Sequence, residues 1–403
     1  MTITDHAFVR ADGRKGIRNT LVVAYLVECA HHVAREIAWP FRERGVHLIG
    51  FGGCFPNDYA ARMMRALCTH PNVGGALLVS LGCESFDRGG LRETIRASGR
   101  PLETLVIQQV GGTRKTIEAG RRAVEQMLAK LEAVPRAPMR VEEFITGTIC
   151  GGSDATSGIT ANPGIGRAFD LLVAQNARCI FEETGELIGC EEIMAARAAT
   201  PELAGILRAS VEKAARYYTV LGHGSFAPGN AEGGLTTQEE KSMGAYSKSG
   251  TAPISGLIKP GDVPPRGGLY LLDVVPDGEV RFGFPNINDN AEIAELIACG
   301  SHLILFSTGR GSVVGSAISP VIKVCANPET YRRMGDDMDV DAGRILEGRG
   351  TLDEVGREIL ELSFAVARGE ATKSESLGHQ EFVLTYKSFE PIGPACLPAT
   401  VAA

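Results

Sequence analysis

Short apolar runs alternate with amphipathic segments through the first third of the chain. The runs at residues 21–27, 46–51, 76–81 and 104–108 have the length and composition of buried strands. Each is followed by a segment with helical periodicity, the last and longest at residues 113–131. Strands that alternate with helices in this way form parallel sheets with helices on both faces. We therefore expect an α/β fold of doubly wound, mostly parallel, Rossmann-like sheets.

Chain length and a short proline-containing segment predict two domains. A chain of 403 residues exceeds what one typical core holds. Residues 132–140 carry two prolines between periodic segments and are the expected linker, after which a strand at residues 144–149 begins the second unit. We expect an N-terminal α/β domain over residues 1–135 and a C-terminal α/β domain over residues 141–403, which ends in an irregular arm.

Charge and hydropathy argue against several classes of protein. The formal net charge of -7 is spread without long blocks of one sign, which argues against nucleic acid or an anionic membrane as a partner. No apolar run approaches the roughly eighteen residues that a bilayer requires, and the first residues lack the pattern of a signal peptide. We expect a cytoplasmic protein whose ten cysteines are free thiols, metal ligands or redox groups.

Four of these cysteines come directly after predicted strands. They are Cys29, Cys54, Cys83 and Cys150. Because the carboxyl ends of the strands line the ligand crevice of an open α/β sheet, these four thiols are expected to converge on one site. Purely structural cysteines are instead expected inside strands or on the inner faces of helices.

The segment CGGSDATSGITANP, residues 150–163, follows one of these strands and precedes a helix. Its glycines let a ligand approach the backbone, and Ser153, Asp154 and Asn162 place polar groups around that ligand. The alternative is an ordinary strand-to-helix loop in which Asn162 caps the helix. Both interpretations can hold at once.

A second polar segment, GNAEGGLTTQEEKSMG, occupies residues 229–244. It contains Asn230 and Lys241, and Lys248 follows just beyond it. A lysine in this place can hold an anionic substrate, or act as a base if burial lowers its pKa. The alternative is a solvated helix face that carries a charge pair.

The segment FSTGRGSVVG, residues 306–315, places Arg310 in a glycine-rich turn after a predicted strand. It lacks the GxGxxG spacing of a dinucleotide-binding turn, and so does the segment after the first strand, which argues against a nicotinamide oxidoreductase. Arg310 is expected to clamp a carboxylate through two parallel hydrogen bonds, with a surface arginine as the alternative. Among the histidines, His70 is the one expected near the crevice.

Six segments together resemble the altronate and galactarate dehydratase family over nearly the whole chain. They are DGRKGIRN (12–19), HPNVGGALLVSLGCE (70–84), CGGSDATSGITANP (150–163), GNAEGGLTTQEEKSMG (229–244), FSTGRGSVVG (306–315) and DDMDVDAG (336–343). The resemblance implies an iron-dependent lyase that removes water from a sugar acid and gives a 2-keto-3-deoxy acid. The same family contains the large subunit of sulfolactate sulfo-lyase, which expels sulfite instead. A non-catalytic sugar-acid-binding subunit is the alternative from another class.

The sequence departs from the family pattern in two places. Single-chain members begin with a small additional domain, whereas this chain opens almost at once on DGRKGIRN. It therefore resembles the large subunit of a two-chain enzyme, which implies a separately encoded small subunit as partner. Where many relatives read GAEH after ETPE, this chain has GCEE at residues 189–192, with Glu192 in place of a histidine. A homodimer is the expected oligomeric state.

The resemblance and the residues together suggest roles for an elimination beside a carboxylate. We expect iron to be bound by Cys54, Cys83 and Cys150, with Cys29 as a candidate fourth ligand. Thiolates favour an iron–sulfur cluster, and the alternative is a mononuclear Fe²⁺ held partly by Asp154. The other expected roles are base or anion holder for Lys241 and Lys248, catalysis for Asp154, and substrate binding for Ser153, Asn162, Asn230, Arg310 and His70.

Overall fold

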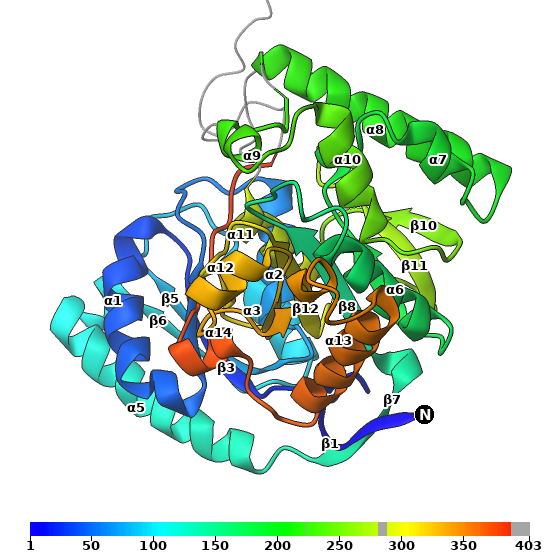
Figure 1. Cartoon of the computed structure of the whole chain (residues 1–403). Coiled ribbons are helices and arrows are strands. Elements are labelled where there is room, and N and C mark those ends of the chain that lie inside the picture. The colour runs from blue at the N-terminus through cyan, green and yellow to red at the C-terminus, as the bar shows by residue number, and fades with distance from the viewer. Residues whose placement is uncertain (223, 281–287, 388–403) are drawn as a thin grey trace, which may run out of the picture.

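Two parallel β-sheets with helices on their faces make up most of the molecule, and a small antiparallel sheet lies beside them (Figure 1). The computed structural model describes residues 1–222, 224–280 and 288–387. Within these residues the strands form sheets of four, seven and three strands. The two parallel sheets confirm the predicted α/β fold with two Rossmann-like units.

The first parallel sheet has the strand order β4-β3-β5-β6. Its strands are β3 (Thr20–Tyr25), β4 (Val46–Gly50), β5 (Val73–Ser80) and β6 (Leu102–Val106). One face is covered by α1 (Glu28–Ala38) and α5 (Thr113–Glu132), and the other by α2 (Asp58–Cys68) and α3 (Arg88–Ala97). Because both faces are covered, β3 and β5 are buried along their length, which explains their continuous apolar sequences.

The small antiparallel sheet has the order β2-β1-β7. Its strands are β1 (Thr2–Val9), β2 (Lys15–Gly16) and β7 (Arg136–Arg140). The sequence predicts an irregular linker at residues 132–140, but this segment contains β7, which pairs with β1. The proline inside β7 is tolerated because this strand lies at the edge of its sheet and has one free side.

The second parallel sheet has the order β10-β11-β9-β8-β12-β13-β14. Its strands are β8 (Ile145–Cys150), β9 (Arg178–Phe181), β10 (Ile254–Ile258), β11 (Gly268–Leu272), β12 (Leu303–Thr308), β13 (Val321–Cys325) and β14 (Val340–Asp341). Three helices pack against one face, α6 (Ala161–Val173), α8 (Pro201–Leu221) and α13 (Leu352–Ala367). Helix α11 (Asp289–Ala298) packs against the other face.

Shorter elements occupy the connections. They are the 3₁₀ turns Trp39–Arg44, Val141–Glu143, Thr184–Leu187 (η3) and Gly343–Ile345, and the helices α4 (Ile107–Val110), α7 (Glu191–Ala195), α9 (Pro228–Glu232), α10 (Gln238–Ser247), α12 (Pro328–Arg333) and α14 (Lys373–Leu377). Across the described ranges, no helix has both the length and the apolar character needed to cross a membrane.

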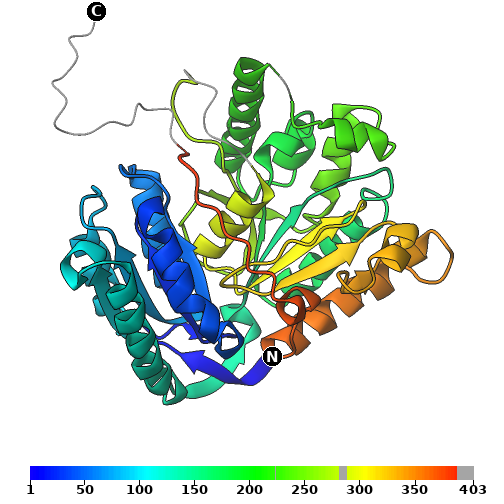
Figure 2. The same cartoon turned by 90° about the vertical axis from the view of Figure 1, so that its left-hand side faces the viewer.

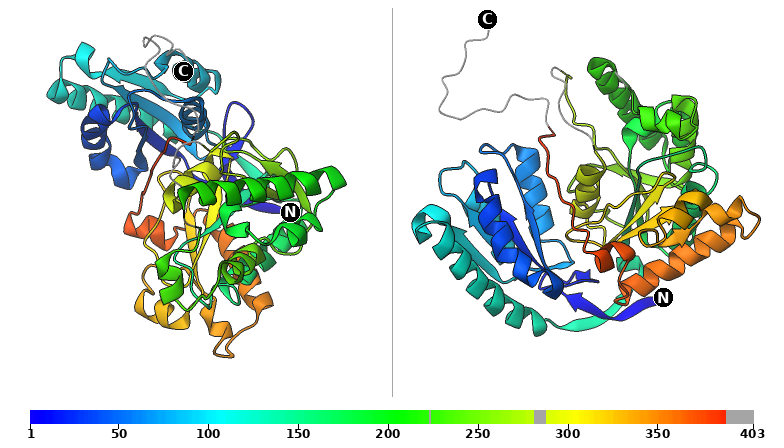
Figure 3. Two further views of the ribbon diagram at one scale, coloured as in Figure 1. Left: turned by 90° about the horizontal axis from the view of Figure 1, so that it is seen from above. Right: turned by 60° about the vertical axis from the view of Figure 1, so that its left-hand side comes forward.

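The two parallel sheets meet along a seam in which α2 of the first unit packs against α11 of the second. Residues 379–387, which we call the C-terminal strap, run between the two sheets (Figure 2; Figure 3). Phe382, Leu384 and Tyr386 of the strap pack against the apolar cluster that both units share. The arm that the sequence predicts at the C-terminus is therefore part of the contact between the two units.

Candidate functional site

A pocket of about 450 Å³ opens where β8 and β9 end, at the carboxyl edge of the second parallel sheet. The loops after these two strands form one wall of the pocket, and the start of α11 forms another. The rest of the pocket is lined by residues between the end of α8 and α10. Its polar lining residues are Cys150, Ser153, Glu183, Glu186, Tyr218, Ser225, Asn230, Lys241, Asn288, Asp289 and Glu292. The carboxyl edge is where open α/β sheets bind their ligands.

A larger cavity of about 570 Å³ lies between the two units, near the amino ends of β3 and β4. Its charged groups already have partners. Arg18 Nε donates to Glu375 Oε1 at 2.7 Å, and His47 Nδ1 lies 2.7 Å from the carbonyl oxygen of Ala317. Because the charged groups of this larger cavity are paired and it lies away from a carboxyl edge, we take the pocket at β8 and β9 as the candidate site.

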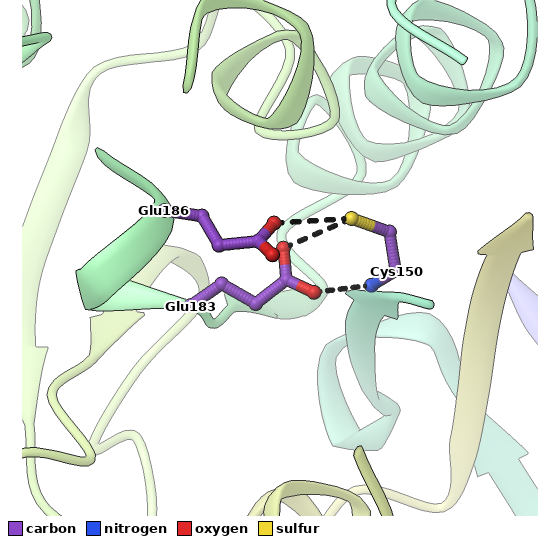
Figure 4. A group of neighbouring side chains, drawn as sticks. All are labelled: Cys150, Glu183 and Glu186. Atoms are coloured by element: carbon purple, nitrogen blue, oxygen red, sulfur yellow. Dashed lines mark hydrogen bonds between the residues drawn. The ribbon is translucent and has the colours of Figure 1, made fainter. Parts of the chain in front are cut away.

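Cys150 ends β8, and its side chain meets two carboxylates from the segment after β9 (Figure 4). The sulfur lies 3.2 Å from Glu183 Oε2 and 3.3 Å from Glu186 Oε2. The Cys150 backbone N–H donates to Glu183 Oε1 at 2.6 Å, and Ser153 Oγ lies 3.4 Å from the sulfur. Among the residues that the structure describes, Cys150, Glu183 and Glu186 are the one group of three potential metal ligands whose ligand atoms lie within 4.8 Å of one another.

The backbone of Glu183 adopts a left-handed conformation, with φ 91° and ψ 51°. Residues that carry a Cβ rarely adopt this conformation, and holding one there costs about 1–3 kcal/mol. The Cys150 N–H and the Lys248 ammonium both contact its carboxylate and fix it in place. Backbone strain at a buried acidic residue in a pocket is typical of a functional site.

The two lysines predicted from sequence each pair with one of these carboxylates. Lys241 Nζ contacts the Glu186 carboxylate and donates to the Ser225 carbonyl at 2.7 Å. Burial acts to lower the pKa of Lys241, but Glu186, together with Cys150 and Asp289, outweighs burial and the pKa is raised. Lys248 is completely buried, pairs with Glu183 and does not line the pocket. Lys241 is therefore a cation at the pocket wall and is poorly suited to act as a base.

Helix α11 places two acidic residues, Asp289 and Glu292, on the opposite wall. Desolvation by the surrounding protein, and then Glu186, raise the pKa of Asp289 to about 6. Burial raises the pKa of Glu292 to about 8, even though the nearby Lys387 acts to lower it. The surroundings therefore favour the protonated form more strongly at Glu292 than at Asp289.

The structure does not bring the four predicted thiols together. Cys29 lies in the first turn of α1, and Cys54 and Cys83 lie in the loops after β4 and β5; all three are exposed. The loops of Cys54 and Cys83 are neighbours, since the Ser85 N–H donates to the Cys54 carbonyl at 2.9 Å. Cys150 belongs to the other sheet, and within the described ranges none of the three joins it in a ligand group. The carboxyl ends of strands share an edge only within one sheet. The four cysteines follow strands of two different sheets, so their positions after strands do not place all four thiols together.

Two further predicted residues, Ser153 and Asn230, do lie at the pocket beside Cys150 and Lys241. Asn230 Nδ2 donates to the Ser153 carbonyl at 3.2 Å and ties the two loops together. The structure therefore places two predicted polar residues, one predicted lysine and one predicted cysteine around the same space.

Asp154 and Asn162 fix the loops around the pocket and do not line it. Asp154 Oδ2 accepts from Asn327 Nδ2 at 3.0 Å. Asn162 Nδ2 donates to the Gly244 carbonyl at 3.0 Å. Their buried side chains are already satisfied by protein groups, so neither is free to contact a substrate.

Arg310 and His70 also lie outside the pocket. Arg310 is partly exposed and pairs with Glu232 at 3.1 Å. His70 is buried in the turn before β5, where its Nδ1 accepts from the Asn72 N–H at 3.0 Å. That turn lies at the amino edge of the first sheet, because it precedes a strand instead of following one. Glu192 is likewise remote and pairs with exposed Arg208 at 2.7 Å.

Four acidic residues of the pocket are missing from the sequence prediction. They are Glu183, Glu186, Asp289 and Glu292. The first two come shortly after β9, and Cys150 is the last residue of β8, so the strand-end rule that selects the cysteines would also have selected them. Asp289 and Glu292 lie in the first turn of a helix, where acidic residues are common for electrostatic reasons alone, and the sequence offers no signal for them.

Comparison with known proteins gives matches over nearly the whole chain. Residues 141–389 match the family model described as D-galactarate/Altronate dehydratase, C-terminal, and residues 7–132 match D-galactarate dehydratase/Altronate hydrolase, second domain. The chain is 34% identical to the (2R)-sulfolactate sulfo-lyase subunit beta of Chromohalobacter salexigens, over 93% of this chain and 95% of that subunit. It is 28% identical to the altronate dehydratase of Bacillus subtilis, over 94% of this chain and 77% of that enzyme. Identity to the galactarate dehydratase (L-threo-forming) of Escherichia coli is 31%, over 76% of this chain and 59% of that enzyme.

Proposed function

Because the chain belongs to the D-galactarate and altronate dehydratase family, we propose that it eliminates water from a sugar acid and leaves a 2-keto-3-deoxy acid. The observation that carries this proposal is the meeting of Cys150, Glu183, Glu186 and Lys241 in one pocket at a carboxyl edge. The pocket offers a cation for the substrate carboxylate and several carboxyl groups for proton transfer. These are the groups that an elimination beside a carboxylate requires.

The thiol and the two carboxylates fit a single divalent transition-metal ion, and we propose Fe²⁺. Their mixed sulfur and oxygen character suits such an ion, whereas an iron–sulfur cluster is held mainly by thiolates and only Cys150 supplies one in this group. Burial, and then Glu186, raise the pKa of Cys150 to about 11, so the thiol keeps its proton unless a cation replaces it. When bound, such an ion would act as a Lewis acid toward substrate oxygens.

The chain's own groups bind and orient the acid in this proposal. Lys241 uses one N–H for Glu186 and one for the Ser225 carbonyl, which leaves a third N–H for a substrate carboxylate. The Ser153 hydroxyl lies where it can bind a hydroxyl group of the substrate. The Asn230 oxygen accepts from the Ala227 N–H and one of its N–H groups binds the Ser153 carbonyl, which leaves one N–H for a second hydroxyl group. Asp289, ionised at neutral pH, is the proposed base that removes the proton next to the carboxylate.

The test is turnover by the purified protein after anaerobic loading with Fe²⁺. Altronate and galactarate are supplied separately, and the 2-keto acid product is measured as its semicarbazone. We expect keto acid from at least one of them, and a large loss of rate in Cys150→Ser. Absence of keto acid from both sugar acids would refute the dehydratase proposal.

A second candidate is carbon–sulfur cleavage of sulfolactate, with release of sulfite. It is favoured by the sulfo-lyase subunit beta, which aligns with this chain over 95% of its own length. The same assay with (2R)-sulfolactate distinguishes the two, because sulfite is detected with a thiol-exchange reagent. Since that relative is a subunit, we also propose a separate small partner subunit, and assays with and without the product of a neighbouring short gene test it.

A further inference from the structure

Lys387, the last described residue of the C-terminal strap, is buried and acts on the acidic residues Glu292 and Glu295 of α11. Tyr386 packs edge-to-face on Phe51, with 5.1 Å between the ring centroids. The next residue, Lys387, lies in the seam between the two units. Lys387 Nζ donates to Glu295 Oε2 at 2.7 Å, and both side chains are almost fully buried. A charged lysine that is buried this deeply requires a carboxylate partner, because an unpaired buried charge is strongly destabilising.

Glu295 joins three separate parts of the molecule. It lies on α11, accepts from Lys387 of the strap at one oxygen, and accepts from the Tyr59 hydroxyl of α2 at the other, at 2.8 Å. Both of its oxygens therefore have charge-stabilising donors. Glu295 is the carboxyl of this region that is best satisfied in its ionised form.

Glu292 lies one turn before Glu295 on α11 and faces the pocket. It is 5% exposed, and no donor within the described residues reaches its carboxyl group. Glu182, which directly follows β9, is fully buried, and both of its oxygens also lack hydrogen-bond partners. Lys387 thus acts on three buried carboxyl groups, those of Glu182, Glu292 and Glu295. The buried Lys248 also acts on Glu182, but its ammonium already pairs with Glu183.

This arrangement cannot hold all three carboxyl groups as anions. An unpaired buried carboxylate costs several kcal/mol and takes up a proton instead. Glu295 is satisfied by Lys387 and Tyr59, so the proton resides on Glu292 or Glu182, and Glu292 is the one of the pair that reaches the pocket. The charged and titratable groups that influence Glu292 are Asp289 and Glu295 on its own helix, Lys387 on the strap, Glu186 on η3, Glu182 after β9, and Tyr217 and Tyr218 on α8.

We propose that Glu292 is the proton donor of the pocket and that Lys387, supplied by the C-terminal strap, is its positioning residue. The role in turnover rests on the proposed elimination, whereas the protonated state of Glu292 does not. In that elimination the base takes the proton next to the carboxylate, and the C–H electron pair becomes the C=C bond. The C–O bond to the neighbouring hydroxyl breaks, and the leaving oxygen takes the Glu292 proton and departs as water. The enol then loses its O–H proton to Glu292, while carbon receives the proton from the base, which restores both groups.

The direct test needs no substrate. Protein labelled with ¹³C-glutamate is titrated while the infrared band of protonated glutamic acid is followed. We expect wild type to show a protonated glutamate at pH 7 that loses its proton near pH 8, in line with the direction set by burial. Glu292→Gln should abolish this transition, and Glu192→Gln, which changes an exposed surface residue, should leave it intact. A transition that survives in Glu292→Gln, or is absent from wild type, overturns the proposal.

The strap is tested with Lys387→Met and Lys387→Arg. Removing the ammonium should raise the midpoint of the Glu292 transition by about one pH unit or more, because a neighbouring opposite charge shifts a pKa by roughly 1–3 units. Arginine should restore most of the wild-type midpoint, whereas an unchanged midpoint in Lys387→Met overturns the positioning role.

If the sugar acid is turned over, Glu292→Gln should lower kcat by about 10²–10⁴-fold with a smaller change in KM. If no sugar acid is turned over, the proposed dehydratase function is refuted. The infrared titration still shows whether the Glu292 carboxyl group is protonated at pH 7.

Discussion

Cys150 and Glu183 are positioned by backbone geometry as much as by side-chain contacts. Cys150 is the last residue of a central strand, and its own N–H binds the Glu183 carboxylate. Glu183 reaches it only from a left-handed backbone conformation. Two neighbouring strand ends therefore fix the thiol and the carboxylate before any ligand arrives, and preorganisation of this kind lowers the free-energy cost of binding.

Glu186→Gln should weaken binding of a divalent cation at this group. The change removes one anionic oxygen donor but keeps the size of the side chain. We expect the dissociation constant for Mn²⁺, used as an air-stable probe, to rise by at least about 10–100-fold, the range known for altered metal-site neighbours. Isothermal titration measures this, with Glu192→Gln as a surface control. Equal affinity in wild type and Glu186→Gln would contradict the assignment.

Lys241→Met should impair substrate binding more than chemistry. The variant removes the cation that is proposed to hold the substrate carboxylate, and a hydrogen bond to a charged group contributes about 1.5–3 kcal/mol. We expect KM to rise by about 10–100-fold with a smaller change in kcat, and Lys241→Arg to recover part of the loss. Steady-state kinetics check this against Lys115→Met, which alters an exposed lysine on α5. A fall in kcat at constant KM would point to a different role.

Helix α10 carries Lys241 and is held close to α6 by small residues. A Cβ added to Gly166 of α6 would lie 2.3 Å from the Ser247 carbonyl oxygen of α10. One added to Gly158 would lie 2.8 Å from the Cα of Gly244. The backbones therefore approach too closely for any side chain, and this contact sets the position of the lysine in the pocket.

Gly166→Ala should destabilise the protein, whereas Gly205→Ala should stabilise it. Overpacking against rigid backbone costs typically about 1–3 kcal/mol. Gly205 lies within α8 with open space around it, so alanine there should gain about 0.5–1 kcal/mol through helix propensity. Denaturant unfolding of the two variants measures both effects. Similar stability changes in both would show that the α6–α10 contact is not tight.

The elements of the first unit could be predicted from the sequence because their strands are buried on both faces and appear as unbroken apolar runs. Strand β7 could not be predicted, since one proline precedes it and another lies inside it, as is typical of a linker, and its pairing with β1 depends on a contact between residues far apart in the chain. The same distinction holds for the residues of the candidate site. Cys150, Ser153 and Lys241 could be predicted because each lies in a recognisable local sequence pattern. Lys387 could not, because its contact with Glu295 depends on how the strap crosses the seam.

The two units are also tied together at the amino edge of the second sheet, through His302. Its Nδ1 accepts from the Ile145 N–H at 3.0 Å, and its Nε2 lies 2.8 Å from the Lys15 carbonyl. This pattern requires a neutral ring that donates from Nε2. Burial lowers the pKa of His302 to about 4, and burial also lowers that of the adjacent His70.

Stability should therefore fall as the pH drops from about 6.5 to 4. An unfolded histidine takes up a proton near pH 6.5, whereas folded His302 does so only near 4, so protons favour the unfolded state within this window. The contribution of His302 is fully present above pH 6.5 and amounts to about 3 kcal/mol. Urea unfolding at several pH values measures it, and His302→Gln should show a shallower pH dependence. Equal slopes in the two proteins would contradict this account.

The whole molecule places an acidic pocket in one unit and exposed thiols in the other, with the strap between them. We propose that Cys150, Glu183 and Glu186 hold one iron ion. Iron K-edge X-ray absorption of the anaerobically loaded protein measures the ligands around that ion. We expect one sulfur ligand among oxygen or nitrogen ligands, no iron–iron scattering, and loss of the sulfur contribution in Cys150→Ser. Several sulfur ligands together with iron–iron scattering would refute the single-iron site and would favour a thiolate-bound cluster.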